Sequence, residues 1–587
     1  MAWQPTLGAV HSAGLTAFRV WAPDARSLEL ETGGARHAMA REPDGCWSIR
    51  LPVGPGTLYR YAPNGDGPFP DPASRFQPEG VHGPSQVVSR EFPWTDDAWA
   101  NLPRERLVIY ELHTGTFTPE GTFAAAAVRL PYLRDLGVTA VELMPVSAFP
   151  GQRNWGYDGV QPFAPAACYG APEDMKAFVD RAHRLGLAVF LDVVYNHFGP
   201  DGAYQGAYSK HYYSDRHGSP WGEGINFDGP HADGVRRYVL ENVRHWVGDF
   251  HLDGLRLDAT HALIDLSPVH ILADIARTAR ETGRPVHIIA EDDRNERRLL
   301  DPAPAGGYAL DGVWADDFHH QIRVRLNGDR DGYFADFDGA APSIARALAD
   351  GWFYSGQRSE SRGAPRGTDP AGIAKDRFVV CIQNHDQIGN RAFGDRLHHT
   401  VSEGAWRAAS ALLLLAPETP LLFMGQEWGA SSPFQFFTDH YEELGKLVTA
   451  GRRREFSRFE AFAGPATRER IPDPQSAVTF ERSKLDWSEI GREPHAGLLA
   501  YCRALLAIRA GLAEPLRPSA LDANTILLEG AVTVVVRLEG AGDAVLPGEW
   551  SVKLASDPRI ALQAGHVAFP GPGAAVFERS LREPVGA

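Results

Sequence analysis

The pattern of apolar and polar positions in the first part of the chain predicts short strands. Apolar and polar side chains alternate over four runs, which are Thr16–Trp21, Leu28–Glu31, Trp47–Leu51 and Thr57–Tyr61. A period of two is that of a half-buried strand, and the Gly/Pro turns between the runs favour antiparallel pairing. We therefore expect an N-terminal immunoglobulin-like β-sandwich over residues 1–90, which ends in a Pro- and Gly-rich linker at residues 68–84.

The pattern changes near residue 107, where short apolar runs begin to alternate with helical segments. Eight runs predict buried strands, at residues 107–112, 138–144, 188–194, 254–258, 286–291, 312–315, 378–382 and 420–424. A helix is predicted before the third run, at residues 172–185. Eight strand–helix units in succession predict a (β/α)8 TIM barrel, which we place at residues 91–515 with long loop insertions.

Strand-like alternation returns in the last part of the chain. The runs Thr525–Leu528, Val532–Arg537 and Trp550–Leu554 predict a C-terminal β-sandwich over residues 516–587. The expected fold class is multidomain α/β plus β, with a central barrel between two β-sandwiches.

Composition narrows the possible function classes. The chain has 587 residues, of which 43% are hydrophobic and 22% charged, so it can bury a large core. Its formal net charge of −16 argues against a nucleic-acid or anionic-membrane partner, because phosphate binding needs Lys/Arg patches. A neutral substrate such as a sugar remains compatible with this charge.

Cysteine spacing and hydropathy indicate a cytoplasmic protein. The N-terminus has no basic stretch followed by an apolar one, so no signal peptide is predicted. The longest apolar run, residues 408–424, contains Pro417 and Pro420 and predicts a buried helix and strand.

The basic stretch Arg452–Glu455 is expected to be a solvated loop. Buried free thiols are expected at the four widely spaced cysteines, Cys46, Cys168, Cys381 and Cys502.

Polar side chains follow several predicted barrel strands at their carboxyl ends. These ends converge on one pocket in a (β/α)8 barrel. A lone Asp there is more often a helix cap, but here four strands carry polar groups at the same end. The groups are Asp192, Asn196 and His197 after the third strand, Arg256 and Asp258 at the fourth, Glu291 at the fifth, and Asn384, His385 and Asp386 at the seventh.

Two of these carboxylates have the surroundings that glycosidic bond cleavage requires. Such cleavage uses one ionised carboxylate and one that is kept protonated. Arg256 lies two residues before Asp258, so both side chains share a strand face and the cation is expected to keep Asp258 ionised. Glu291 is followed by Asp292 and Asp293, whose charges are expected to raise its pKa and favour the acid role.

Four strings in this region resemble the ordered signature regions of the α-amylase family of glycoside hydrolases. One such string alone would be a weak signal, but all four occur in the family's order and on the matching strands. The resemblance extends over roughly the whole chain, because Phe18–Pro23 resembles the β-sandwich that precedes the barrel in debranching and branching members. The four strings are Asp192–His197, Gly254–Ala259, Ala290–Glu291 and Asn384–Asp386.

The resemblance implies a role for each site residue. Asp258 would be the nucleophile, Glu291 the general acid/base and Asp386 the stabiliser of the transition state. The family retains anomeric configuration, so the Asp258 and Glu291 carboxyls are expected about 5–5.5 Å apart. The implied substrate contacts are Tyr157 stacking on the sugar ring, His197 and His385 hydrogen-bonding it, Arg256 orienting the nucleophile, and Asn384 and Gln387.

Further strings resemble the branch of this family that cleaves the α-1,4 bond next to the terminal trehalose of maltooligosyltrehalose. These strings are Ala290–Asn295, Trp314–His320, Asn384–Asn390, Gly425–Phe434 and Phe437–His440. They imply trehalose-side contacts from the sixth strand, at Asp316, Asp317, His319 and His320, although the same cluster could instead structure its loop. Trp428, Phe434 and Phe437 could form a sugar platform or equally lie in the core beneath a long loop.

Several alternatives share the three catalytic carboxylates. A branching, debranching or maltogenic enzyme of the same family would differ only in its outer subsites. A non-catalytic carbohydrate-binding protein is disfavoured, because such proteins lose a catalytic carboxylate. No metal is expected, since no Asp-rich ligand loop accompanies Asn196, and no cofactor, since no phosphate-binding or dinucleotide fingerprint occurs. The implied metabolic partner is a maltooligosyltrehalose synthase.

Overall fold

The N-terminal region forms two antiparallel four-stranded sheets in the computed structural model, which describes residues 3–219, 221–458 and 464–579. The first sheet has the order β1-β2-β6-β5 and the second β4-β3-β7-β8. All four predicted strands are present, and the sheets lie within residues 8–86. The strands are β1 Gly8–Ser12, β2 Leu15–Trp21, β3 Leu28–Thr32, β4 Ala35–Ala38, β5 Ala40–Arg41, β6 Cys46–Leu51, β7 Leu58–Pro63 and β8 Ser85–Gln86.

Eight parallel strands close into the central barrel, in the order β10-β13-β16-β17-β18-β21-β22-β9. Each of the eight predicted apolar runs contains or overlaps one of them, so the barrel prediction is confirmed. Apolar runs serve as barrel strands because a parallel sheet is buried on both faces. The strands are β9 Ile109–Leu112, β10 Ala140–Leu143, β13 Ala188–Val193, β16 Gly254–Leu257, β17 His287–Glu291, β18 Gly312–Trp314, β21 Phe378–Cys381 and β22 Thr419–Phe423.

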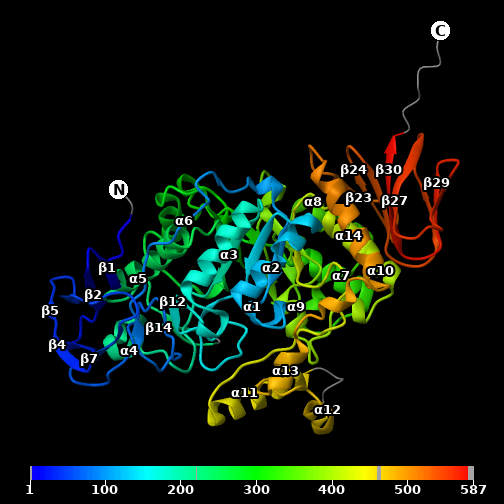
Figure 1. Ribbon diagram of the computed structural model, residues 1–587. Coiled ribbons are helices and arrows are strands. Elements are labelled where there is room, and N and C mark those ends of the chain that lie inside the picture. The colour runs from blue at the N-terminus through cyan, green and yellow to red at the C-terminus, as the bar shows by residue number, and fades with distance from the viewer. Residues whose placement is uncertain (1–2, 220, 459–463, 580–587) are drawn as a thin grey trace.

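Helices surround the barrel and fill its loop excursions. The helix predicted at residues 172–185 is α3, which lies beside α2 in Figure 1. The helices are α1 Thr114–Phe117, α2 Phe123–Leu136, α3 Pro172–Arg184, α4 Gln205–Tyr208, α5 Ala232–Arg244, α6 Ile271–Glu281, α7 Asp317–Asn327, α8 Ala341–Asp350, α9 His385–Gly389, α10 Glu403–Leu414, α11 Glu442–Glu455, α12 Pro465–Glu469, α13 Ala477–Arg482 and α14 His495–Ala510. Short hairpins occur in the loops, from β11 Ser147–Ala148 and β12 Gln161–Pro165, β14 Tyr213–Ser219 and β15 Gly222–Ile225, and β19 Arg358–Ser359 and β20 Ala364–Pro365.

The C-terminal region forms a second β unit that contacts α8 and α10. Its sheets have the orders β23-β24-β25-β30-β27 and β26-β29-β28. The strands are β23 Arg517–Ala520, β24 Thr525–Glu529, β25 Thr533–Arg537, β26 Gly542–Val545, β27 Trp550–Ala555, β28 Ala561–Gln563, β29 His566–Phe569 and β30 Gly573–Arg579.

The two β units lie on opposite sides of the barrel (Figure 1). The N-terminal unit is joined to α5, where Arg237 forms an ion pair with Asp44 at 2.6 Å. A yellow segment with α11, α12 and α13 projects from the lower side. The fold is therefore a (β/α)8 barrel with flanking β domains, while the predicted domain boundaries stay predictions.

One local prediction is wrong, because Arg452–Glu455 is the end of helix α11 rather than a solvated loop. The Arg452 guanidinium is buried, donates to the carbonyl oxygen of Arg391 at 3.3 Å and lies over the ring of Phe436. Buried carbonyl oxygens and an aromatic face thus replace solvent around Arg452, whereas Arg454 and Glu455 are exposed as expected.

Two further predictions are confirmed in their main parts. The apolar run at residues 408–424 is buried and divides into α10 and β22. All four cysteines are free, and three are buried while Cys168 is half-buried. Within the described residues, no helix is both long and apolar enough to cross a membrane.

Candidate active site

Arg256 joins the carboxylates of three neighbouring barrel strands. The β13, β16 and β17 strands are adjacent, and Asp192 pairs in register with Arg256. The guanidinium donates from Nη1 to Asp192 at 2.7 Å and to Asp258 at 2.8 Å. Its Nη2 forms an ion pair with Glu291 at 3.1 Å. The predicted pairing of Arg256 and Asp258 on one strand face is confirmed.

Arg256 is held in place on its other side by an aromatic ring. Its side chain is fully buried, and the guanidinium lies 4.3 Å from the centroid of Trp314 on β18. A cation on an aromatic face within a closed barrel has little freedom to reorient. The three carboxylates are therefore organised around one rigid positive charge.

Asp258 has donors on both of its oxygens. Oδ1 accepts from Arg256, and Oδ2 accepts from the Asn196 side chain at 2.8 Å. Hydrogen bonds of this kind stabilise the ionised carboxylate. The side chain is 12% exposed, so it remains accessible from the mouth of the barrel.

Glu291 differs from Asp258 in its electrostatics. Its side chain is 23% exposed, and Oε2 accepts the backbone N–H of Ala259 at 2.7 Å. Burial raises the pKa of Glu291 well above its usual range, and the charges of Asp258 and Asp386 raise it further against the opposing effect of Arg256.

The predicted direction of this pKa shift is confirmed, but the predicted cause is wrong. Asp292 is turned away and pairs with Arg294 at 2.6 Å, while Asp293 pairs with Arg362. Each neighbouring charge thus has its own cation, and burial is the main cause of the shift at Glu291.

Asp386 lies at the start of α9 and is the most exposed of the three carboxylates, at 36%. Its Oδ1 accepts from Asn390 at 3.0 Å, and its Oδ2 lies 3.4 Å from Nε2 of His385. Burial alone would lower the pKa of His385, but the charges of Asp386 and Glu111 raise it to about 9.

Tyr157 and His197 line the same mouth. The Tyr157 ring stacks on His385 with centroids 5.2 Å apart, and its hydroxyl donates to Asp192 at 2.5 Å. His197 contacts the carbonyl oxygen of Tyr157 at 3.0 Å through Nε2. The half-exposed indole of Trp221, from the β14–β15 hairpin, stacks on His197.

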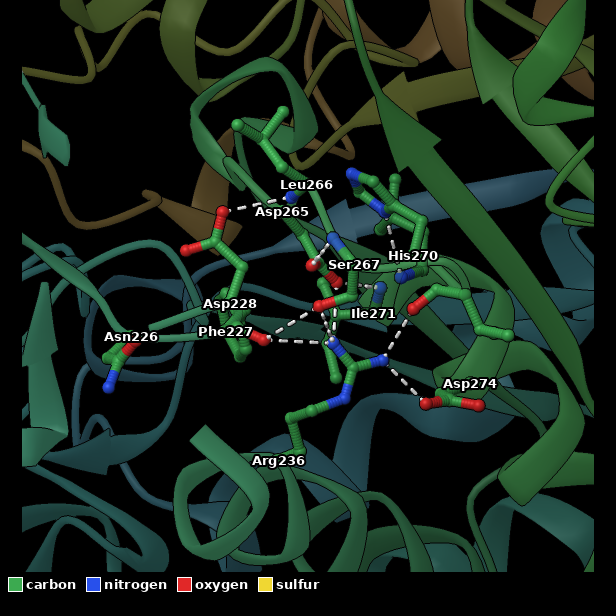
Figure 2. Close-up of polar contacts among 12 residues, drawn as sticks. Asn226, Phe227, Asp228, Arg236, Asp265, Leu266, Ser267, His270, Ile271 and Asp274 are labelled. Carbon is green, nitrogen blue, oxygen red and sulfur yellow. Dashed lines mark hydrogen bonds and ion pairs between the residues drawn. The ribbon is translucent and has the colours of Figure 1, made fainter. Parts of the chain in front are cut away.

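The loop that begins at Asp258 is fixed to α5 by a largely buried arginine (Figure 2). Arg236 donates from Nη1 to Asp265 and from Nη2 to Asp274, both at 2.6 Å. Asp265 also accepts the backbone N–H of Ile271 at 2.6 Å, at the start of α6. This arginine clamp gives the loop between β16 and α6 a defined position beside the site.

The predicted trehalose-side residues divide into one accessible group and three buried ones. Asp316 is half-buried, and burial together with the charges of Asp293 and Asp386 raises its pKa to about 7. It remains a predicted substrate contact. Asp317, His319 and His320 are buried in the first turn of α7.

Asp317 organises a loop rather than the cleft, which corrects its predicted role. Its Oδ2 accepts the backbone N–H groups of Phe353 and Tyr354 at 2.8 and 3.0 Å, and its Oδ1 pairs with Arg366 at 2.8 Å. These bonds occupy both oxygens of a fully buried side chain, so no sugar reaches it in this conformation.

The two histidines of α7 also belong to the interior, contrary to the prediction. His319 Nδ1 donates to the carbonyl oxygen of Ile382 at 2.9 Å. His320 packs against Phe334 and Phe337, and burial lowers its pKa to about 3. Both are therefore neutral side chains that connect α7 to its surroundings.

Trp428 is fully buried against Tyr132 and Trp487, so of its two interpretations the substrate-contacting sugar platform is wrong and the core is right. Phe434 and Phe437 are equally buried, which decides their open assignment in favour of the core. A ring without exposed surface has no face to offer a sugar.

The remaining predicted residues lie at the N-terminus of α9. Asn384 caps the helix, because its side chain accepts the backbone N–H of Gln387 at 2.9 Å. The Gln387 side chain is half-buried beside Asp386 and stays a predicted substrate contact. Asn384 is buried, so its capping role is the one that the geometry supports.

Sequence reasoning missed Glu111 and Glu142, which lie side by side in register on β9 and β10. Both are buried, and each is the single charge within an apolar strand run. That isolation was a usable signal, because an unpaired charge in a barrel strand is costly. The contact of the Trp314 ring with the Arg256 guanidinium could not be predicted from the spacing of residues along the chain.

Within the described part of the chain, no cluster of three or more His, Cys, Asp or Glu side chains could hold a metal ion. The side-chain amide of Asn196 donates to Asp258 at 2.8 Å. The charged side chains of the site are thus carboxylates grouped around Arg256.

Comparisons with known proteins agree with this geometry. The family described as alpha amylase, catalytic domain, matches residues 86–230. The chain is 48% identical over 537 residues to a malto-oligosyltrehalose trehalohydrolase from Deinococcus radiodurans, covering 90% of this chain and 87% of the relative. It is 43% identical to a protein of the same name from Rhizobium sp. (strain M-11), covering 98% of this chain and 99% of the relative.

A solved structure extends the agreement to the whole fold. The crystal structure of a putative alpha amylase from Salmonella typhimurium is 38% identical to this chain and has a TM-score of 0.90. The match covers 98% of this chain and all of that chain. The chain thus belongs to the malto-oligosyltrehalose trehalohydrolase family, within the alpha-amylase glycoside hydrolases.

Proposed function

We propose that this protein hydrolyses the α-1,4-glucosidic bond next to the terminal trehalose of maltooligosyltrehalose. The products would be free trehalose and a maltooligosaccharide, with retention of anomeric configuration. Family membership supports the substrate, because relatives of 48% and 43% identity carry the name malto-oligosyltrehalose trehalohydrolase.

The observation that carries the proposed chemistry is that Asp258 and Glu291 share Arg256 but differ in their hydrogen-bond donors and their electrostatics. Asp258 is stabilised as an anion by two side-chain donors. Glu291 has a strongly raised pKa. One ionised and one protonated carboxyl on adjacent strands is the pair that a retaining glycosidase needs.

In the first step Asp258 attacks the anomeric carbon of the sugar. The bond from that carbon to the glycosidic oxygen breaks, and Glu291 gives its proton to the leaving oxygen. Oε2 of Glu291 already accepts the Ala259 N–H, and the described chain gives Oε1 no hydrogen bond. We therefore assign the transferred proton to Oε1.

In the second step water hydrolyses the glycosyl ester on Asp258. Glu291, now ionised, takes a proton from the water, whose oxygen attacks the anomeric carbon and frees Asp258. Arg256 remains paired with whichever carboxylate carries charge, so neither step leaves an unpaired anion in the barrel. Asp386 would stabilise the positive charge on the sugar ring in both transition states.

The substrate of this reaction must be supplied by an enzyme that builds a trehalose end on a maltooligosaccharide. We propose a maltooligosyltrehalose synthase as that metabolic partner. A branching enzyme is the main alternative within the family, but a matching branching enzyme, from Bordetella parapertussis, aligns with only 42% of this chain.

The anomeric form of the first product tests the retaining chemistry. Proton NMR during early turnover should show the α-anomer at the new reducing end, before mutarotation. Asp258→Ala should lose turnover by about 10³-fold or more while still binding oligosaccharide. Early appearance of the β-anomer would exclude the roles assigned to Asp258 and Glu291.

A further inference from the structure

His385 is held between two carboxylates, one inside the barrel and one at its mouth. Its Nδ1 contacts Oε1 of Glu111, and its backbone N–H donates to Oε2 of the same residue at 3.1 Å. Its Nε2 lies 2.8 Å from the Tyr157 hydroxyl and 3.4 Å from Asp386. Glu111 is buried on β9 and has no place in the chemistry described above.

Counting hydrogen-bond donors fixes the protonation of Nε2. Tyr157 has a single hydroxyl proton, and it points at Asp192, 2.5 Å away. Asp192 acts as an acceptor, because the same oxygen also receives Arg256 at 2.7 Å. Burial raises the pKa of Asp192 to about 6, which still leaves it ionised at pH 7. Nε2 of His385 must therefore donate to the Tyr157 oxygen.

The same counting applies to Nδ1. Oε2 of Glu111 accepts the backbone N–H of His385, and Oε1 lies against Nδ1. A carboxylate at this position can only accept, so Nδ1 would have to supply the proton of that contact. Nδ1 therefore carries a proton as well. An imidazole that donates from both nitrogens is an imidazolium cation.

We propose that Glu111 is a positioning residue that holds His385 as an imidazolium, giving the site a second fixed cation besides Arg256. This inference rests on the proposed glycosidase function and adds a charge state to one of its sugar-contacting residues. The Nε2–H group would then face the cleft as a charge-assisted donor, while the carboxylate behind it fixes the orientation of the ring.

Charged and titratable groups surround His385 from several elements. Asp386 and Glu111 favour the cation, and Arg256 opposes it. Burial raises the pKa of Glu142, the neighbour of Glu111 on β10, well above its usual range, which favours its neutral form. Burial also lowers the pKa of His113 to about 4, so that it adds no charge. The groups facing His385 are Glu111, His113, Glu142, Tyr157, Asp192, Arg256 and Asp386.

The proposal predicts the direction in which the pH–rate profile moves when Glu111 loses its charge. In Glu111→Gln the His385 cation loses its main buried partner, so the pKa of His385 should fall. The decline of kcat on the alkaline side of the profile should therefore begin at a lower pH. If the alkaline limb instead reports Glu291, loss of the nearby cation would raise the pKa of Glu291 and move the limb upwards. The two origins therefore shift the profile in opposite directions.

Glu142→Gln is the matched control. Glu142 is in register with Glu111 in the same buried layer, and the described chain gives its side chain no hydrogen bond. The amide keeps the shape of the side chain, and burial without a partner already disfavours a charge on Glu142. We expect its pH profile to stay that of the unmodified protein.

The first measurement is nitrogen NMR of the protein labelled at its histidines, with His385 assigned by its loss in His385→Gln. Doubly protonated His385 at pH 7 supports the proposal, and a neutral tautomer in the unmodified protein overturns it. This readout needs no substrate and no variant of Glu111. It therefore separates failure of this inference from failure of the proposed function.

The second measurement is the pH dependence of kcat and KM for any α-glucan that the protein cleaves. Glu111→Gln should move the alkaline limb of kcat down by at least about one pH unit, with KM changed less than kcat. Glu111→Asp should restore part of the shift. An unmoved limb in Glu111→Gln would contradict the proposal, because the charge on His385 would then not depend on Glu111.

Discussion

The backbone N–H of Ala259 donates to Oε2 of Glu291 at 2.7 Å, so the residue after the proposed nucleophile also binds the proposed acid. Ala259 has a left-handed backbone, with φ 42° and ψ 55°, and is almost fully buried. An L-residue with a side chain rarely adopts this conformation. The strain is located where it aims an N–H group at a reacting carboxyl.

Substitutions of Ala259 should therefore separate the effect of its backbone strain on stability from its effect on catalysis. Ala259→Gly should stabilise the protein by up to about 1 kcal/mol, because glycine adopts positive φ freely. Ala259→Val should lower both the melting temperature and kcat, since a β-branched residue neither fits nor tolerates this conformation. Ala309, with φ 57° in the loop before β18, offers a control in Ala309→Val. That control should lose stability but keep kcat, and equal loss of kcat in both valine variants would contradict the argument.

Asp316 and Asp317 are adjacent but should respond differently to the same change. Asp316→Asn should raise KM for maltooligosyltrehalose roughly tenfold without loss of stability, if this half-buried carboxyl contacts the sugar. Asp317→Asn should lower stability by about 3 kcal/mol or more, because Arg366 and two backbone N–H groups lose a buried anion. Thermal unfolding and steady-state kinetics on both variants test this. A stable Asp317→Asn protein with raised KM would restore the original sequence prediction.

The arginine clamp of Figure 2 can be tested with two arginines that bind the same aspartate. Arg236 and Arg277 each contact Asp274 at 2.6 Å, but Arg236 is 12% exposed and Arg277 is 59% exposed. Arg236→Met should cost about 3–5 kcal/mol, since it also leaves the buried Asp265 without its cation. Arg277→Met should cost less than about 1 kcal/mol. Similar melting temperatures for both variants would argue against the clamp.

Glu418 should make stability depend on pH far from the active site. It lies just before β22 at the amino end of the barrel and is fully buried, and the described part of the chain gives neither of its carboxyl oxygens a hydrogen bond. Burial raises its pKa to about 8 from an ordinary value of 4.5. The folded state then holds a proton that the unfolded state releases, so stability falls as pH rises from about 4.5 to about 8.

Glu418→Gln should remove this dependence. The variant should exceed the unmodified protein in stability by at least about 1 kcal/mol at pH 8 and by less at pH 5. Turnover should not change, because the site is at the opposite end of the strands. A stability difference that is the same at both pH values would show that titration of Glu418 is not its cause.

The barrel was predictable because its strands are buried on both faces. Runs such as Ala188–Val193 are apolar except for Asp192 and alternate with helices, so the number and order of the strands could be predicted directly. The two-residue strand β5 and the β14–β15 hairpin could not, since neither has a hydrophobic pattern of its own. Their positions depend on contacts made elsewhere in the fold.

Site residues at the ends of barrel strands were predictable from the sequence, and residues in the helices and loops that follow were less so. Asp258, Glu291 and Asp386 lie at the mouth because strand ends fix them, and Arg256 pairs as its spacing indicates. At the start of α7 the sequence places Asp316 and Asp317 together, but consecutive helical positions point in different directions, so Asp316 is half-buried and Asp317 is buried. Burial of Trp428 could not be foreseen, because an aromatic residue in a loop motif fits a platform and a core equally well.

The most direct test of the central claim compares maltotriosyltrehalose with maltopentaose as substrates, with Glu291→Gln as the inactive control. Both chains have five glucose units, so a difference in rate reports recognition of the trehalose end. The account predicts trehalose and maltotriose as products, released well above the rate of maltopentaose cleavage. Equal cleavage of both would contradict a trehalose-directed site, and new α-1,6 branches would indicate a branching enzyme.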